Sequence, residues 1–348
     1  MLPNKSGVTV AEKLPLDVKV TQFLIDDILL SNIRPYFKKI WLAEFSGGCS
    51  ADVLVFRTNS NYDPRYIKYC LSQNSFFEYD MIGSKGSKMP RGDKDHILNF
   101  EVLDIDLTSQ QNISRLLDGL DKKIILNNKI NSELEKIAQT LYNYWFAQFD
   151  FPDEFGRPYK SSGGKMVYNE VLKREIPANW EVKHVKDFVD VITGKEDANF
   201  SDPNGQYNFF TCGDEVLKCN EFAFCGKSIL IAGNGNFNIK YFDGKFNAYQ
   251  RTYVLQPKDV QYIGIIYLSA VNRIQAFTRG SSGSIVKFIT KGDVENIPLL
   301  LPNNKNLLNI FNSLLDQQNH LRNEIERLTS LRDFLLPMLM NGQVTINS

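Results

Sequence analysis

The chain has 348 residues, of which 43% are hydrophobic and 23% are charged. This composition indicates a globular protein that buries a core, and it excludes a chain that is disordered throughout. Forty Lys and Arg residues balance forty Asp and Glu residues, so a site for a polyanion must be a local patch. No stretch approaches the roughly eighteen apolar residues of a membrane span, and the first residues do not resemble a signal peptide. We therefore expect a cytoplasmic protein without a membrane segment.

The five cysteines are Cys49, Cys70, Cys212, Cys219 and Cys225. Their number is odd and their density low, which argues against a disulfide framework. None forms a CxxC pair, and the chain has only three histidines, so the pattern favours small buried thiols over a zinc site. We expect no metal and no cofactor.

The sequence repeats itself at an offset of about 200 residues. Residues 27–31 match 228–232, and 53–55 match 253–255. The clearest gapless match aligns Gly83, Ser84, Gly92, Asp93 and Ile97 with Gly283, Ser284, Gly292, Asp293 and Ile297. The chain therefore consists of a module, a long helix, a connector, a second module and a second long helix.

The sequence pattern of each module is that of a mixed α/β unit. Short runs rich in β-branched residues, at 28–33, 51–56, 228–233 and 251–256, predict strands bounded by Gly, Asn and Asp. Longer segments at 66–81 and 262–278 have apolar residues at helical spacing. The predicted fold is thus α/β, with two modules in tandem.

Residues 112–146 and 306–342 have apolar residues spaced three and four apart, as in a coiled coil. We expect the two helices to pair antiparallel, with a stutter near Asn127 and Asn128 in the first helix and polar breaks at Gln318 and Asn323 in the second. Pro337 should kink the last turn of the second helix, and Asn341 and Gly342 should end it. The predicted seam comprises Ile113, Leu117, Leu120, Ile124, Ile130, Leu134, Ile137, Leu141 and Tyr144, and Leu308, Phe311, Leu315, Leu321, Ile325, Leu328 and Leu335.

Four segments resemble the specificity subunits of type I restriction-modification systems: GSKMPRGDK at 86–94, and the segments 142–166, 175–188 and 331–342. The resemblance covers almost the whole chain. It implies a non-catalytic reader of double-stranded DNA, in which two target-recognition domains each bind one half of a split target. It also implies that the paired helices set the half-site spacing and dock two methyltransferase (modification) subunits, and that ATP-dependent restriction subunits join the larger complex.

On this basis the expected domains are a first target-recognition domain at 1–106, a central coiled-coil helix at 107–150 and a connector at 151–175. A second target-recognition domain follows at 176–303, and a C-terminal coiled-coil helix at 304–342. The first domain has only 26 residues before Asp27, against about 50 between Ile176 and Lys227 in the second. We therefore expect the first domain to be short at its N-terminus, because it is either divergent or truncated.

Catalytic motifs are not apparent. The tetrapeptide at 63–66 lacks the second proline of an adenine methyltransferase motif, and the Gly- and Lys-rich 83–88 segment lacks P-loop spacing. DNA reading needs Arg or Lys for phosphates and guanine edges, and Asn or Gln for adenine. The candidates are Asn32, Arg34, Lys38, Lys85, Lys88 and Arg91 in the first module, and Asn234, Asn236, Gln250, Arg251, Arg279, Lys287 and Lys291 in the second.

Two other functions compete with DNA recognition. A short first domain is compatible with an N-truncated specificity cassette that only binds methyltransferase as a scaffold. A self-contained modification enzyme is disfavoured, because the sequence shows no cofactor loop. The aromatic cluster of Tyr142, Tyr144, Trp145 and Phe146 is either a packed anchor for the connector or a methyltransferase contact.

Overall fold

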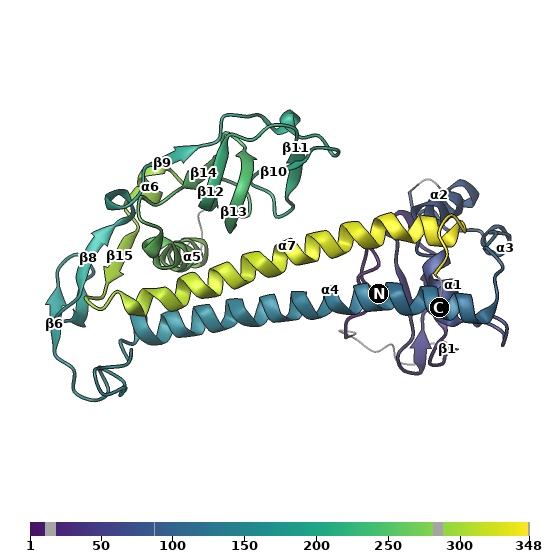
Figure 1. The fold of residues 1–348 in the computed structure, drawn as a ribbon, viewed down its shortest axis with the longest axis horizontal. Helices are drawn as coiled ribbons and strands as arrows, with labels where there is room; N and C mark the ends of the chain where they lie inside the picture. The colour runs from purple at the N-terminus through teal and green to yellow at the C-terminus, as the bar shows by residue number, and fades with distance from the viewer. Residues whose placement is uncertain (11–18, 87, 281–287, 347–348) are drawn as a thin grey trace. The chain divides into compact units, whose positions relative to one another are not determined.

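The computed structural model describes residues 1–10, 19–86, 88–280 and 288–346. The chain divides into two compact units. Unit 1 comprises Met1–Leu126 and Ile325–Ser348, and unit 2 comprises Asn127–Glu324. Two long helices, α4 (Leu107–Tyr142) and α7 (Asn306–Met340), each contribute residues to both units (Figure 1).

Unit 1 contains a three-stranded antiparallel sheet. Its central strand β2 (Ile28–Ser31) lies between β3 (Ile40–Leu42) and β5 (Val53–Phe56). Because successive side chains point to opposite faces of a strand, β2 serves two apolar clusters. Ile28 and Leu30 belong to one cluster and Leu29 to the other. This double burial explains why the β2 sequence is continuously apolar.

The remaining elements of unit 1 cover this sheet or lead into α4. Pro64 starts α1, and the side chain of Asp63 caps it by accepting from the Tyr66 backbone N–H at 2.9 Å. The elements are β1 (Thr21–Phe23), which pairs with β4 (Gly47–Cys49), the 3₁₀ turn η1 (Pro35–Phe37), and the helices α1 (Pro64–Cys70), α2 (Asn74–Gly83) and α3 (Lys94–Leu98).

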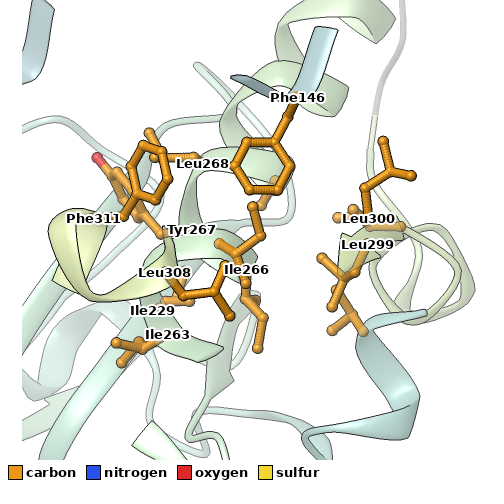
Figure 2. Close-up of a cluster of buried hydrophobic side chains, with 14 of the residues drawn as sticks. Phe146, Ile229, Ile263, Ile266, Tyr267, Leu268, Leu299, Leu300, Leu308 and Phe311 are labelled. Atoms are coloured by element: carbon orange, nitrogen blue, oxygen red, sulfur yellow. The ribbon is translucent and has the colours of Figure 1, made fainter. Parts of the chain in front are cut away.

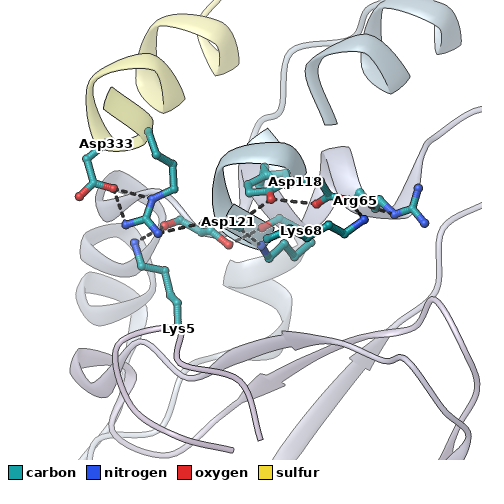
Figure 3. Close-up of polar contacts among 10 residues, drawn as sticks. Lys5, Arg65, Lys68, Asp118, Asp121 and Asp333 are labelled. Atoms are coloured by element: carbon teal, nitrogen blue, oxygen red, sulfur yellow. Dashed lines mark hydrogen bonds and ion pairs between the residues drawn. The ribbon is translucent and has the colours of Figure 1, made fainter. Parts of the chain in front are cut away.

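An ion-pair network in unit 1 joins α1, α4 and α7 (Figure 3). Arg332 of α7 donates to Asp121 of α4 at 3.0 Å, and Lys68 of α1 lies 3.5 Å from the same carboxylate. The hydroxyl of Tyr69 lies 2.8 Å from Asp121 and 2.9 Å from Asp118. The network thus binds the first module to both long helices.

Unit 2 contains a six-stranded sheet in the order β11-β10-β13-β12-β14-β9. Only β10 and β13 are parallel; the other neighbours are antiparallel. The strands are β9 (Val191–Thr193), β10 (Tyr207–Phe210), β11 (Leu217–Cys219), β12 (Phe224–Ala232), β13 (Ile239–Ala248) and β14 (Thr252–Leu255).

Two small antiparallel sheets and two helices complete unit 2, so both units combine strands with helices. Strand β8 pairs with β15, which leads into α7. The elements are β6 (Met166–Asn169), β7 (Arg174–Pro177), β8 (Glu181–His184), β15 (Pro298–Leu301), α5 (Ile263–Gly280) and α6 (Lys291–Glu295), with 3₁₀ turns η3 (Val185–Asp187), η4 (Ala198–Phe200) and η5 (Val260–Tyr262).

The main core of unit 2 lies where the ends of α4 and α7 meet α5 and β12 (Figure 2). Phe146 is buried, with its ring centroid 5.7 Å from that of Phe311 and 5.2 Å from that of Tyr142. Trp145 also contacts Phe311, at 5.7 Å. These three members of the aromatic cluster act as a packed anchor, whereas Tyr144 remains 38% exposed.

The predicted stutter in α4 is wrong. The helix is continuous, and the seam positions continue at spacings of three and four through Asn127 and Ala138, which are buried. Ile130 and Ile137, which were expected in the seam, are 40% and 52% exposed. The apolar pattern was misleading because asparagine occupies a seam position: Asn127 Nδ2 donates to Glu324 of α7 at 2.8 Å.

The ends of the long helices differ. Gly342, with a φ of 70°, terminates α7 in a Schellman motif, in which the Gln343 N–H donates to Met338 O at 2.9 Å. This confirms the predicted stop at Asn341 and Gly342. α4 instead passes into the π-helical turn η2 (Asn143–Ala147), and the bulky Phe149 adopts a φ of 66° after it.

Candidate nucleic-acid interface

In unit 1 three loops meet just beyond the end of strand β2. The Asn32 N–H donates to Asp52 O at 2.8 Å, and Asn32 O accepts from the Gly92 N–H at 3.0 Å. The strand end is therefore tied to the loop before β5 and to the loop before α3. We call this three-way contact at Asn32, Asp52 and Gly92 the unit 1 junction.

Two sequence candidates stand on the loop that enters this junction. Lys85 and Arg91 exchange backbone hydrogen bonds at 2.9 Å in both directions. The Lys85 ammonium pairs with Asp93 at 2.5 Å, and the Arg91 guanidinium pairs with Asp52 at 3.0 Å. Both cations are mainly exposed, and Lys88, on the same loop, is exposed as well.

Arg34 joins the same region. Its backbone has a φ of 52°, which is uncommon for a residue other than glycine, and its N–H donates to Pro90 O at 2.8 Å. Lys38 does not join the junction: its ammonium donates to Asn74 Oδ1 at 2.8 Å, at the start of α2. The structure thus brings together five of the six candidates of the first module.

Unit 2 contains the same arrangement. The Gly233 N–H donates to Arg251 O at 2.9 Å, and Gly233 O accepts from the Ile289 N–H at 2.8 Å. Gly233 follows β12 as Asn32 follows β2, and Ile289 precedes α6 as Gly92 precedes α3. We call this contact the unit 2 junction.

Asparagines of the second module lie beside this junction. Asn236 Nδ2 donates to Asp214 at 2.8 Å, and Asn238 Nδ2 donates to Cys212 O at 3.0 Å. Lys240 donates to Gly213 O at 2.7 Å, and burial lowers its pKa, although Asp214 opposes this effect. Asp214 is the partner that the sequence reasoning missed, because that reasoning searched for basic and amide side chains only.

Three of the other candidates of the second module flank the junction residues in the sequence. Asn234 is partly exposed next to Gly233, and Gln250 is exposed, with its N–H donating to Glu196 O at 2.9 Å. Lys291 is the first residue of α6 and pairs with Glu295 at 3.4 Å. The side chain of Arg279, and the whole of Lys287, lie outside the described residues.

The helix caps correct the register of the predicted repeat. Asp93 caps α3 by accepting from the Asp95 and His96 N–H groups, whereas Thr290 caps α6. Asp293 is instead the third residue of α6 and completes a capping box with Thr290. The two helices therefore correspond at an offset of 197, and the gapless match at 200 aligned residues with different roles.

Among the described residues, the cysteines and other potential metal ligands do not form a metal site. Cys70 and Cys219 are buried as expected, but Cys225 is exposed. Within the described ranges, no group of three His, Cys, Asp or Glu side chains is placed to hold a metal ion. None of the helices that the structure describes is long and apolar enough to cross a membrane.

Residues 177–327 match the family model for the type I restriction modification DNA specificity domain. The chain is 36% identical over 178 residues to the EcoDI specificity subunit of Escherichia coli, a match that covers 49% of this chain and 40% of that protein. It is 25% identical to the HindI specificity subunit of Haemophilus influenzae, over 91% of this chain and 86% of that one.

The fold is also similar to that of a solved structure. The crystal structure of the type I restriction-modification system S subunit from M. genitalium superposes with a TM-score of 0.56 at 15% identity. The superposition covers 98% of this chain and 99% of the relative. By sequence, the chain is thus similar to type I restriction-modification specificity subunits, and it spans less than half of the EcoDI subunit that it matches.

Proposed function

We propose that this chain is the DNA-recognition subunit of a type I restriction-modification complex and catalyses no reaction itself. The observation that carries the proposal is the presence of one junction in each unit. Asn32 with Asp52 and Gly92, and Gly233 with Arg251 and Ile289, form the same two backbone hydrogen bonds. Two like junctions support a target of two halves, each read by one unit.

The side chains around the junctions have the chemistry that base reading requires. In unit 1, Arg34, Lys85 and Arg91 supply donors for phosphates and for guanine edges. In unit 2, Asn234 and Gln250 supply amides, which suit adenine. The carboxylates of Asp52 and Asp93 neutralise Arg91 and Lys85 in the free chain. DNA binding would exchange these ion pairs for phosphate contacts and is therefore expected to weaken with salt.

The paired helices offer the surfaces for partner subunits. In unit 2, Ile130, Ile137 and Ile310 are exposed apolar residues on α4 and α7. A groove of about 680 Å³ lies between these helices, lined in part by Ile130 and Leu134. Apolar residues exposed on helices favour protein partners, and we assign this surface to one of two methyltransferase subunits. Restriction subunits would join the larger cytoplasmic complex.

Genomic methylation mapping tests the proposal. The chain is expressed with its methyltransferase and restriction partners, and a methylated motif with two separated halves is expected. Arg91→Ala should relax the motif in one half, and Arg251→Ala should relax it in the other. Lys136→Ala, which alters an exposed cation of α4, is the matched control and should leave the motif intact. A methylated motif that is one uninterrupted sequence would contradict the proposal.

The scaffold alternative has one observation in its favour. Among the described residues the sheet of unit 1 has three strands and that of unit 2 has six. A smaller first unit is compatible with a cassette that binds methyltransferase but reads no complete target. Retention of methyltransferase binding without any methylated motif would support this alternative over DNA recognition.

A further inference from the structure

Asp80 is a fully buried carboxyl group beneath the unit 1 junction. It lies in α2 with none of its surface exposed, and neither of its oxygens has a hydrogen-bond partner. Burying an unpaired carboxylate is costly, and buried polar groups in folded proteins are nearly always hydrogen-bonded. The position of Asp80 therefore requires a proton or a partner.

The side chain of Asn32 reaches the same side of Gly92 as Asp80. A Cβ atom placed on Gly92 would lie 2.2 Å from Asp80 Oδ1 and 2.9 Å from Asn32 Oδ1, so both oxygens adjoin Gly92 on the same side. Asn32 Oδ1 is also buried and without a partner. Asn32 as a residue is partly exposed, although its amide oxygen is buried.

One proton can satisfy two unpartnered acceptor oxygens that lie close to the same glycine. A neutral carboxylic acid donates one hydrogen bond, whereas a carboxylate only accepts. Burial raises the pKa of Asp80 to about 6, and His96 of α3 opposes this shift. The His96 ring stacks on Tyr79, with Nε2 2.9 Å from Tyr79 O, and it is the titratable group of the described residues that acts on Asp80.

We propose that Asp80 is a positioning residue of the unit 1 junction: its carboxylic acid donates a hydrogen bond to Asn32 Oδ1 beneath Gly92 and holds the Asn32 amide nitrogen outward. The proposal rests on the proposed function, because the outward nitrogen matters only if the junction reads DNA. Glycine at position 92 leaves room for these oxygens, since a Cβ there would lie 2.2 Å from Asp80 Oδ1.

Ionisation of Asp80 removes the donated hydrogen bond. The pKa of Asp80 in the folded chain is raised above its unfolded value, so the folded state binds this proton more tightly. The stability that Asp80 contributes is therefore present at low pH and is lost as pH rises through about 6. In the ionised state the Asn32 amide must turn its nitrogen inward, which exchanges the donor at the junction surface for an acceptor.

Three variants of the full chain test the proposal. Asp80→Asn keeps the shape and supplies a permanent N–H donor to Asn32 Oδ1. Asp80→Leu removes all hydrogen bonding, and Glu78→Gln neutralises an exposed carboxylate on the same helix as a matched control. Thermal unfolding is followed from pH 5 to pH 8. Relative to Asp80→Asn, the wild type should lose about 2–4 °C as pH rises, while Glu78→Gln follows the wild type.

DNA binding is then measured at pH 5, where Asp80 is protonated, for each variant with its methyltransferase subunit, on an oligonucleotide that carries the mapped target. Asp80→Leu should weaken binding about tenfold, in line with one lost base contact, and Asp80→Asn should restore it. Equal losses in Asp80→Asn and Asp80→Leu would overturn the proposal, as would parallel pH profiles of the wild type and Asp80→Asn. If no variant binds DNA, the proposed function fails, while the pH profiles still decide the Asp80 and Asn32 contact.

Discussion

Arg332 of α7 donates to Asp121 of α4 at 3.0 Å, although the two residues are 211 positions apart in the sequence. The pair is largely buried, with side chains 24% and 22% exposed. Tyr69 of α1 lies 2.8 Å from the same carboxylate. One residue of α4 thus holds three elements of unit 1 together, which makes it a sensitive point for stability.

Asp121→Asn should therefore destabilise the chain by about 2–4 kcal/mol, because it leaves Lys68 and Arg332 without their shared partner. Burial opposes ionisation of Asp121, but Lys68, Tyr69 and Arg332 outweigh it, and the pKa of Asp121 lies below its ordinary value. The contribution is thus complete above about pH 4 and is lost as pH falls through the lowered pKa. Denaturant unfolding between pH 3 and pH 7 checks this; a variant as acid-sensitive as the wild type would contradict it.

The Lys136 and Glu133 pair provides a surface comparison. The two side chains lie 2.8 Å apart on exposed α4 positions. Exposed pairs contribute little, because water and side-chain entropy offset the attraction. Lys136→Met should change the free energy of unfolding by less than about 0.5 kcal/mol. If Lys136→Met lowered the free energy of unfolding as much as Asp121→Asn, the ion-pair network of unit 1 would contribute no more to stability than an exposed pair.

Two alanine variants distinguish a residue that packs in the core from one that could bind a partner. The residues are Phe146 and Tyr144, which lie within one turn of each other. Phe146 is buried against Phe311, so its truncation should cost about 3–5 kcal/mol in thermal or chemical unfolding. Tyr144 is exposed, and its truncation should leave unfolding unchanged. If the surface at η2 docks methyltransferase, Tyr144→Ala should lower affinity in a pull-down titration. Equal destabilisation by both changes would show that this distinction is wrong.

Replacement by alanine should change stability in opposite directions at two glycines. At Gly119, on α4, an added Cβ would meet no atom within 4 Å, and alanine favours the helix by about 1 kcal/mol. At Gly342 the φ of 70° disfavours alanine by about 1–2 kcal/mol, and the Cβ would lie 3.1 Å from Leu103. Differential scanning calorimetry should show a higher Tm for Gly119→Ala and a lower one for Gly342→Ala. Shifts of the same sign would refute the helix-end assignment.

Asn127→Leu tests why a polar residue lies in the helix seam. Leucine should raise the Tm, because it replaces an amide whose Oδ1 is buried without a partner. It should also weaken the unique pairing of α4 with α7, since a polar seam residue fixes register at the expense of stability. Light scattering should then detect dimers. A more stable variant that stays uniformly monomeric would show that Asn127 has no role in register.

The positions of helices and strands could be predicted from the sequence more accurately than the side-chain contacts between them. The continuous apolar run at Ile28–Leu30 marked a buried strand, and Asn341 with Gly342 marked the end of α7. The polar seam at Asn127 was missed, because periodicity counts apolar residues only. The helix caps were misaligned for a similar reason: Gly and Asp recur at 92–93 and 292–293, but local hydrogen bonds give the second Asp another role.

The candidate interface was only partly predictable. Loops with Arg, Lys and Asn were expected near Arg91 and Asn236, and the structure brings many of them to the junctions. The carboxylates that pair with them were not expected, because the search for DNA contacts excluded acids. Asp80 gave no signal at all: its neighbours Gly92 and Asn32 lie 12 and 48 positions away in the sequence, and only folding makes them adjacent.

The bonds that define each junction run between main-chain atoms, from Asn32 to Asp52 and Gly92 and from Gly233 to Arg251 and Ile289. Every amino acid except proline supplies the same amide and carbonyl groups. Side chains at these loops can therefore be exchanged while the frame that presents them persists. If the junctions read DNA as proposed, such a frame would let new targets arise by point substitution, without changes to the fold of the unit that carries the junction.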